Sequence, residues 1–208
     1  MDSRLLAFLG VSLLLALTPG PDFALVTRNA LAHGRRGVLL TSAGLTTALV
    51  VWVTVTALGA AAVLQTSAAV YSVLKLAGAA YLIYLGARTL WESRRDHGLR
   101  LDGVRPARPR ALAIWRQGFL SALLNPKLGV FFVTFLPQFV NPGQPVLPRV
   151  LLLGGIFTVI GIAWMTLYGL SVSRLRAVVT APRVRRWMER TTGTVLVGFG
   201  ARLALDRV

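Results

Sequence analysis

The sequence predicts an all-α integral membrane protein with six transmembrane helices arranged as two inverted three-helix repeats. The 208 residues are 55% hydrophobic and 14% charged, with a mean hydropathy of +0.65, whereas a soluble domain has about 25% charged residues. Several apolar runs exceed the roughly 18 residues that indicate a transmembrane helix. Two of these runs are interrupted by proline at corresponding places in the two halves of the chain.

The apolar runs define six spans, of which the first and the fourth are broken near the middle of the membrane. The spans cover 5–32, 38–64, 68–90, 112–136, 147–171 and 191–206. The chain is therefore expected to form one membrane domain, 1–208, made of a first repeat with its cytoplasmic linker, 1–104, and a second repeat, 105–208. Three spans per half is an odd number, so the halves must cross the membrane in opposite senses. Many secondary transporters have this plan and bind substrate where the repeats meet.

The net charge of +16 comes mainly from arginines that lie between the apolar runs. A nucleic-acid-binding protein would gather such residues on one face of a soluble fold beside stacking aromatic residues, so nucleic acid is not an expected partner. Most of the basic residues follow the first, third and fifth spans. Because cytoplasmic loops carry an excess of Lys and Arg, both termini are predicted to lie outside. The chain has no cysteine, which excludes disulfides and thiolate metal sites.

The first span is interrupted by a stretch that cannot continue an α-helix. Two prolines and a glycine occur within the run Thr18-Pro19-Gly20-Pro21-Asp22. Proline lacks the backbone N–H, and it forces the preceding residue out of the helical region. In a bilayer, broken backbone is tolerated only where it is buried in protein or lines a wet cavity. Apart from Asp206 at the very end of the last span, Asp22 is the only acidic residue inside a span, and an intramembrane carboxylate indicates a functional site.

The fourth span has a matching interruption at Asn125-Pro126-Lys127. Asparagine followed by proline is typical of the N-cap and first residue of a helix. Two half-helix N-termini near the midplane would each carry about half a positive charge and favour a substrate carboxylate. A lysine in a first helical turn is unfavourable to the helix dipole, so we expect Lys127 to approach Asp22. A cavity with one anion and one cation could hold both ends of an amino acid.

Two further features of the spans are open to more than one interpretation. Lys75 lies inside the third span and either lines the site or snorkels to the nearby membrane surface. Glycines are expected to let helices pack closely, and faces of small residues are compatible with a homodimer. These glycines are Gly44, Gly59, Gly78, Gly86, Gly118, Gly154, Gly155, Gly161, Gly193, Gly198 and Gly200.

Three motifs, in order along the chain, resemble those of a known family. They are the run Thr18 to Asp22; Lys75-x-x-Gly78-x-x-Tyr81-Leu82-x-x-Leu85-Gly86; and Gly118-Phe119 followed by Asn125-Pro126-Lys127, Phe131-Phe132 and Leu136-Pro137-Gln138-Phe139. Together with the length and the six spans, they resemble the lysine exporter/homoserine–threonine exporter superfamily (LysE/RhtB) over nearly the whole chain. The aspartate after Pro-Gly-Pro resembles the threonine/homoserine exporter branch, whereas many relatives have asparagine there.

The resemblance implies a multi-pass protein of the bacterial inner membrane that exports amino acids, driven by the proton gradient. Its partners would be an amino-acid substrate, protons and membrane lipid, with no cofactor. The substrate carboxylate would meet Lys127 and the half-helix N-termini, and its ammonium would meet Asp22 with help from an oxygen of Thr18 or Asn125. A proton that reaches Asp22 from outside would release the ammonium. The substrate-binding residues are expected to be Thr18, Pro19, Gly20, Pro21, Asp22, Lys75, Asn125, Pro126 and Lys127.

The expected function is efflux of a neutral or small polar L-amino acid such as threonine or homoserine, and the alternative is export of another small metabolite or a cation. A metal cargo is disfavoured because the spans lack histidine, cysteine and multiple carboxylates, and Lys127 would repel a cation. An intramembrane enzyme would need paired carboxylates, a Ser–His arrangement or metal ligands. The spans hold no histidine and no pair of carboxylates, so the protein is not expected to be an enzyme. A channel would need a ring of like groups, and the sequence has no such repeat.

Overall fold

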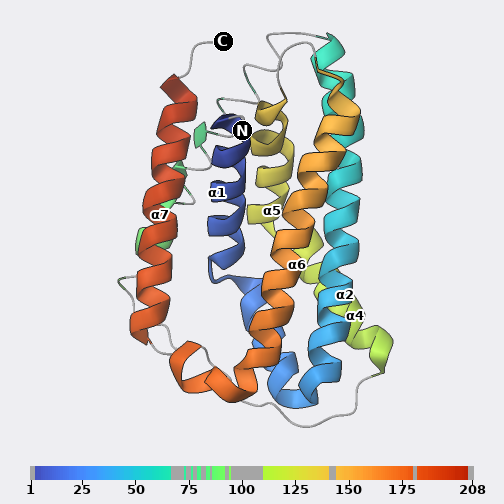
Figure 1. Cartoon of the computed structure of the whole chain (residues 1–208), viewed down its shortest axis with the longest axis vertical. Coiled ribbons are helices and arrows are strands. Elements are labelled where there is room, and N and C mark those ends of the chain that lie inside the picture. The colour runs from blue at the N-terminus through green and yellow to red at the C-terminus, as the bar shows by residue number, and fades with distance from the viewer. Residues whose placement is uncertain are drawn as a thin grey trace.

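Every element in the described part of the chain is a helix, as the composition predicted. The structure is a computed structural model that describes residues 3–66, 110–140, 144–179 and 182–205, with isolated residues and one short stretch between 73 and 94. The helices run roughly along one axis, and the start of the first helix and the end of the last lie at the same end of the bundle (Figure 1).

The first predicted span is broken where its prolines predicted. Helix α1 (Ser3–Leu17) ends before Thr18, and helix α2 (Pro21–Thr66) begins at the second proline. Helix α2 contains a sharp turn at Gly34, with φ 56° and ψ −144°, a conformation that favours glycine. The chain reverses there (Figure 1), so residues 21–33 form an inner arm and residues 35–66 a return arm. The predicted spans 5–32 and 38–64 are thus joined by a turn without a loop.

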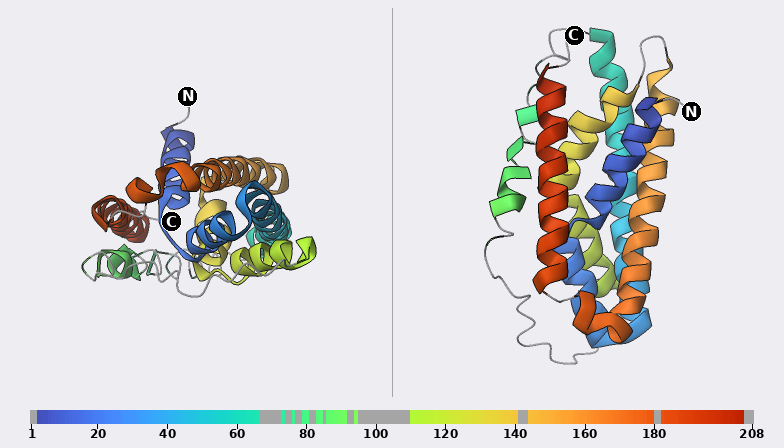
Figure 2. Two further views of the ribbon diagram at one scale, coloured as in Figure 1. Left: turned by 90° about the horizontal axis from the view of Figure 1, so that it is seen from below. Right: turned by 60° about the vertical axis from the view of Figure 1, so that its left-hand side comes forward.

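The fourth predicted span is broken at Asn125, also as predicted. Helix α4 (Ala111–Leu123) and the helical segment after it (Pro126–Phe139) are bent by 50° at the break. That segment consists of α5 (Pro126–Val130), a π-helix (Phe131–Phe135) and a 3₁₀-helix (Leu136–Phe139). It lies in the middle of the bundle, enclosed by α1, α2 and helix α6 (Val146–Val179) (Figure 2).

The last two helices extend further than hydropathy predicted. Helix α6 continues beyond residue 171, and helix α7 (Pro182–Leu205) begins well before residue 191. The helix begins before the predicted span because hydropathy measures apolar content, whereas residues 183–190 are rich in arginine, which is a good helix former. Pro182 takes the first helical position, where its missing N–H costs nothing.

The number of membrane spans is only partly established by the described helices. By length and composition, two of them could cross a membrane, Pro21–Gly59 and Val146–Val172, and the bent pair that includes α4 would be a third. Helix α1 supplies a shorter apolar helix, Leu5–Leu17. The third predicted span, including Lys75, lies largely outside the described residues. Six spans in two inverted repeats therefore stay a prediction.

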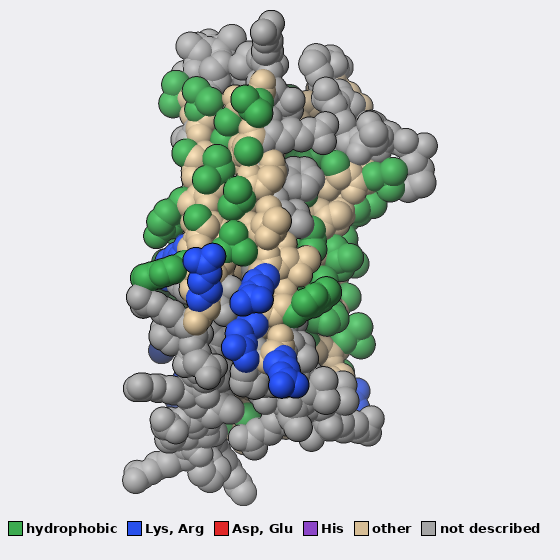
Figure 3. Space-filling model, turned by 90° about the vertical axis from the view of Figure 1, so that its left-hand side faces the viewer, with side chains coloured by type: hydrophobic (Ala, Val, Ile, Leu, Met, Phe, Trp, Pro, Cys, Tyr) green, Lys and Arg blue, Asp and Glu red, His purple; other side chains and the backbone are tan. Residues whose placement is uncertain are grey.

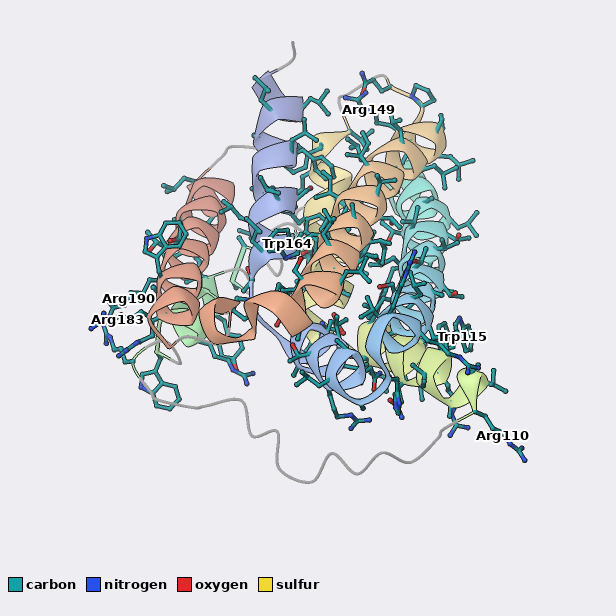
Figure 4. The ribbon with its side chains drawn as sticks, turned by 60° about the horizontal axis from the view of Figure 1, so that its bottom comes forward. Arg110, Trp115, Arg149, Trp164, Arg183 and Arg190 are labelled. Atoms are coloured by element: carbon teal, nitrogen blue, oxygen red, sulfur yellow. The ribbon has the colours of Figure 1, made fainter. Side chains whose placement is uncertain are left out.

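Arginines that the sequence assigned to different sides of the membrane lie at opposite ends of the bundle. Arg110, Arg183 and Arg190 lie at the end where α4 and α7 begin, and Arg149 lies at the other end, near the start of α6 (Figure 4). On the face that α7 covers, basic side chains gather on the lower part and hydrophobic side chains lie above them (Figure 3). This distribution is that of a membrane protein with one arginine-rich end.

Glycines let the backbone of α4 come into direct contact with the backbone of the return arm of α2. A Cβ on Gly118 would collide with the carbonyl oxygen of Thr41, and one on Gly44 with that of Trp115. The expected close packing is confirmed at four more positions, Gly86, Gly154, Gly193 and Gly200, where an added Cβ would lie less than 3.0 Å from a backbone or side-chain atom. It is not seen at Gly59, Gly155, Gly161 and Gly198, where no described atom lies within 4 Å of an added Cβ, and Gly78 lies outside the described residues.

Candidate functional site at the two helix breaks

The first break leaves the last carbonyl groups of α1 at an open helix end. Thr18 is buried, and its N–H donates to the carbonyl oxygen of Leu14 at 3.1 Å, as does its hydroxyl at 2.7 Å. Pro19 and Pro21 have no N–H to donate. The carbonyls at the end of a helix lack intrahelical partners and need donors from elsewhere. The end of α1 therefore presents oxygen atoms, a suitable surface for a cation.

The second break has the N-cap that the sequence predicted. Asn125 is buried, and its Oδ1 accepts the backbone N–H of Lys127 at 3.0 Å, with Pro126 at the first helical position. The N–H groups of Leu128 and Gly129 both donate to the carbonyl oxygen of Asn125 at 3.1 Å. The capping prediction for Asn125 and Pro126 is thus confirmed.

Asp22 reaches from the first break to the end of α4 and to the second break. Its Oδ1 accepts a hydrogen bond of 2.5 Å from the hydroxyl of Ser121, and its Oδ2 accepts one of 2.9 Å from Nδ2 of Asn125. The Asn125 side chain therefore contacts Asp22 and caps α5 at once. Two neutral donors hold the carboxylate in one orientation, and Asp22 is only partly buried.

Lys127 makes the reciprocal contact, from the second break to the end of α1. Its ammonium donates to the carbonyl oxygens of Leu15 at 3.1 Å and Thr18 at 3.4 Å. A cation is stabilised at a helix C-terminus because the dipole is negative there. Gly20 lies beside this contact, since an added Cβ would be 3.9 Å from the ammonium nitrogen. The unfavourable place of Lys127 in its own helix is thereby offset at the end of another.

The two charged residues belong to one site but bind different groups. We expected Lys127 to approach Asp22, and both residues contact the side chain of Asn125, Asp22 through its carboxylate and Lys127 through its backbone N–H. Their hydrogen-bond partners are nevertheless neutral: Ser121 and Asn125 for the carboxylate, and two carbonyl oxygens for the ammonium. Asn125 is the residue that connects them. The arrangement can offer one acceptor and one donor of full charge to a zwitterion.

A cluster of aromatic rings lies next to the site, toward the end of the bundle at which α1 begins. Phe131, from the π-helix, contacts Phe8 at a ring-centroid distance of 6.3 Å and Phe157 at 4.3 Å, and it also lies against Phe132 and Phe135. All five rings are at most 3% exposed. This buried cluster lies between the two breaks and the end of the bundle that holds the start of α1.

Comparison with known proteins agrees with this architecture. A family model described as LysE type translocator matches residues 13–207. The chain belongs to this family of translocators.

Three curated relatives of this LysE type translocator are efflux proteins for amino acids or their derivatives. The homoserine/homoserine lactone efflux protein of Salmonella typhimurium is 31% identical over 97% of this chain and 96% of the relative. The leucine efflux protein of Klebsiella pneumoniae is 30% identical over 96% and 93% of the two chains. The threonine efflux protein of Escherichia coli K12 is 23% identical over 95% of each. No solved structure matches the chain.

The structure of this translocator brings together most residues that the sequence singled out. Thr18, Asp22, Asn125 and Lys127 join in the contacts described above, while Pro19, Gly20, Pro21 and Pro126 shape the two breaks. Lys75 lies outside the described residues. Sequence reasoning missed Ser121. It stands one helical turn before Asn125, on the face of α4 that leads to the break, and this spacing was the available signal.

Proposed function

We propose that this chain is a secondary transporter that exports neutral or small polar L-amino acids, such as threonine or homoserine, across the bacterial inner membrane in exchange for protons. The observation that carries the proposal is the reciprocal contact of the two breaks: Asp22 binds groups at the second break, and Lys127 binds groups at the first. The named relatives, which are efflux proteins for homoserine, threonine and leucine, support an amino acid as cargo.

When the substrate binds, Asp22 and Lys127 each exchange a hydrogen bond to a neutral group for one to a charged group of the substrate. Its carboxylate takes the ammonium of Lys127, assisted by the positive N-terminal ends of α2 and α5. When Lys127 turns toward that carboxylate, the carbonyl oxygens of Leu15 and Thr18 are left for another donor. The substrate ammonium binds these oxygens together with Asp22. The oxygen of Thr18 in this role is its carbonyl, which already accepts the ammonium of Lys127 at 3.4 Å.

Proton exchange takes place at Asp22. A proton that arrives from outside neutralises the carboxylate, which then attracts the substrate ammonium less strongly, and the amino acid is released. The charge on Asp22 is restored when the proton leaves toward the cytoplasm. Alternating access comes from rocking of the first inverted repeat against the second. The contacts of Asp22 and Lys127 across the two breaks support this coupling, because both must change when the repeats move.

The arginine-rich end of the bundle is the cytoplasmic end in this proposal, and both termini lie on the periplasmic side. The positive-inside rule sets this orientation. The separation of Arg110, Arg183 and Arg190 from Arg149 supports it (Figure 4). The aromatic cluster around Phe131 then lies between the site and the periplasm. The exchange of substrate for proton therefore requires this cluster to open.

Efflux from proteoliposomes tests the proposal directly. Vesicles that hold the purified protein are loaded with a panel of labelled amino acids, and a pH gradient is imposed. We expect saturable efflux of small neutral L-amino acids that the gradient accelerates, and loss of that acceleration in Asp22→Asn. Efflux by Asp22→Asn at the normal rate and with unchanged pH dependence would disprove the role of Asp22. Absence of any amino-acid efflux from the wild-type protein would disprove the function.

A further inference from the structure

A second polar layer lies between the inner arm of α2 and α4, on the arginine-rich side of Asp22. Gln117 precedes Ser121 by one helical turn, and Asn29 follows Asp22 by two turns, so each pair shares a helix face. In this layer Gln117 Oε1 accepts hydrogen bonds from Arg28 Nη2 at 3.0 Å and Asn29 Nδ2 at 3.4 Å. The two layers form a polar strip that leads from the arginine-rich end to the site.

The side chains of this layer are fixed by contacts between separate elements. Asn29 is only 1% exposed, and its amide also donates to the Thr41 hydroxyl on the return arm at 2.8 Å. Gln117, on α4, is thereby held against the inner arm. It in turn anchors Arg28, whose side chain is exposed. Arg28 lies in the helical inner arm and not in a loop, so its side chain is directed by this contact as well as by the general excess of arginine at this end.

The charge of Arg28 is not balanced by its partner. Its hydrogen bond goes to a neutral amide, and Asp22, bound by Ser121 and Asn125, is the only carboxylate whose side chain the structure describes. A guanidinium has five N–H donors in a planar fork that matches a carboxylate. Fixed and exposed, Arg28 therefore presents donors that a carboxylate-bearing molecule can bind.

We propose that Arg28, held by Gln117, is an outlying subsite that binds the carboxylate of the amino acid on the arginine-rich side before Lys127 receives it. This inference rests on the proposed function. It assigns substrate recognition to a residue outside the two breaks, and it predicts a preference for molecules with a free carboxylate at this side of the protein. Passage from Arg28 to Lys127 follows the polar strip past Asn29 and Ser121.

The test compares Arg28→Gln with a matched variant, Arg36→Gln, which removes an exposed positive charge next to the Gly34 turn. Labelled homoserine is presented to reconstituted protein from either side, and homoserine lactone, which has no free carboxylate, is measured as a competitor. We expect Arg28→Gln to raise the half-saturation concentration about tenfold from the arginine-rich side, the effect of losing one charge-assisted contact. The half-saturation concentration from the opposite side, the maximal rate and the inhibitory potency of the lactone should each stay within about twofold of the wild-type value.

Two further variants keep the test decisive. Arg28→Lys preserves the positive charge but not the planar guanidinium, so it should raise the half-saturation concentration from the arginine-rich side by less than Arg28→Gln does. Gln117→Leu leaves Arg28 in place without its anchor and should also raise the half-saturation concentration from that side alone. The inference is wrong if Arg28→Gln behaves like Arg36→Gln, or if homoserine and its lactone are affected equally. A wild-type protein that exports no amino acid would instead overturn the proposed function itself, and the inference with it.

Discussion

Asn125 connects the two charged residues of the site, so its replacement tests whether this connection serves transport. Its Nδ2 donates to Asp22 at 2.9 Å, while its Oδ1 accepts the N–H of Lys127 at 3.0 Å. Serine is as good an N-cap as asparagine, but a serine hydroxyl that caps α5 has no second polar group to reach Asp22. Asn125→Ser therefore removes the bridge and keeps the cap, whereas Asn125→Ala removes both.

The two contacts predict different sizes of effect. An N-cap contributes about 1 kcal/mol to stability, and a hydrogen bond to a charged group contributes about 1.5–3 kcal/mol. Asp22 is partly exposed and keeps its bond to Ser121, so water can replace the lost bridge, and we expect Asn125→Ser to unfold almost like the wild type. Its half-saturation concentration should rise about tenfold, which corresponds to about 1.4 kcal/mol. Asn125→Ala should lose about 1 kcal/mol more stability.

Both quantities can be measured on the same preparations. Efflux is followed in proteoliposomes over a range of internal amino-acid concentrations, and thermal unfolding is followed in detergent. Wild-type efflux kinetics in Asn125→Ser would refute the idea that orientation of Asp22 matters. A loss of stability in Asn125→Ser as large as that in Asn125→Ala would show that the bridge serves folding rather than transport.

Four other substitutions have expected outcomes. Gly118→Ala should lower the unfolding free energy by about 1–3 kcal/mol, because the new Cβ collides with the carbonyl of Thr41. Gly155→Ala, with no described neighbour within 4 Å, should gain up to about 1 kcal/mol of stability from helix propensity. An equal change of unfolding temperature in Gly118→Ala and Gly155→Ala would contradict the close packing of Gly118 against Thr41. Lys127→Met should abolish efflux and destabilise the end of α1 by about 1–3 kcal/mol, measured by efflux and thermal unfolding. Phe131→Ala should cost about 3–5 kcal/mol and let substrate leak without a pH gradient.

Local chemistry made the two breaks predictable from the sequence. Proline cannot donate a hydrogen bond, so the interruption at Pro19 and Pro21 follows from the residues themselves. The capping role of Asn125 before Pro126 likewise depends on neighbours in the chain. These features need no knowledge of tertiary structure, and they fixed the region in which the site lies.

Contacts between distant segments were not predictable in the same way. Ser121 and Asp22 are 99 residues apart in sequence, and only the packing of α4 against the inner arm brings them together. The destination of the Lys127 ammonium, at the carbonyls of α1, also depends on this packing. The π-helix at Phe131–Phe135 has an ordinary apolar sequence, so its irregular hydrogen bonding left no compositional signal.

The neutral partners of Asp22 and Lys127 explain why the site suits a zwitterion better than a simple ion. A direct ion pair between the two would resist a substrate, because separating it leaves two partly buried charges without partners. With neutral partners, each charge can exchange a hydrogen bond to a neutral group for one to a group of opposite charge, which adds the Coulomb attraction between the two charges. An amino acid makes this gain at both breaks. A cation makes it only at Asp22 and meets the repulsion of Lys127, and an anion has the converse difficulty. If the site binds an amino acid as proposed, the same geometry should therefore discriminate against an inorganic ion of either sign.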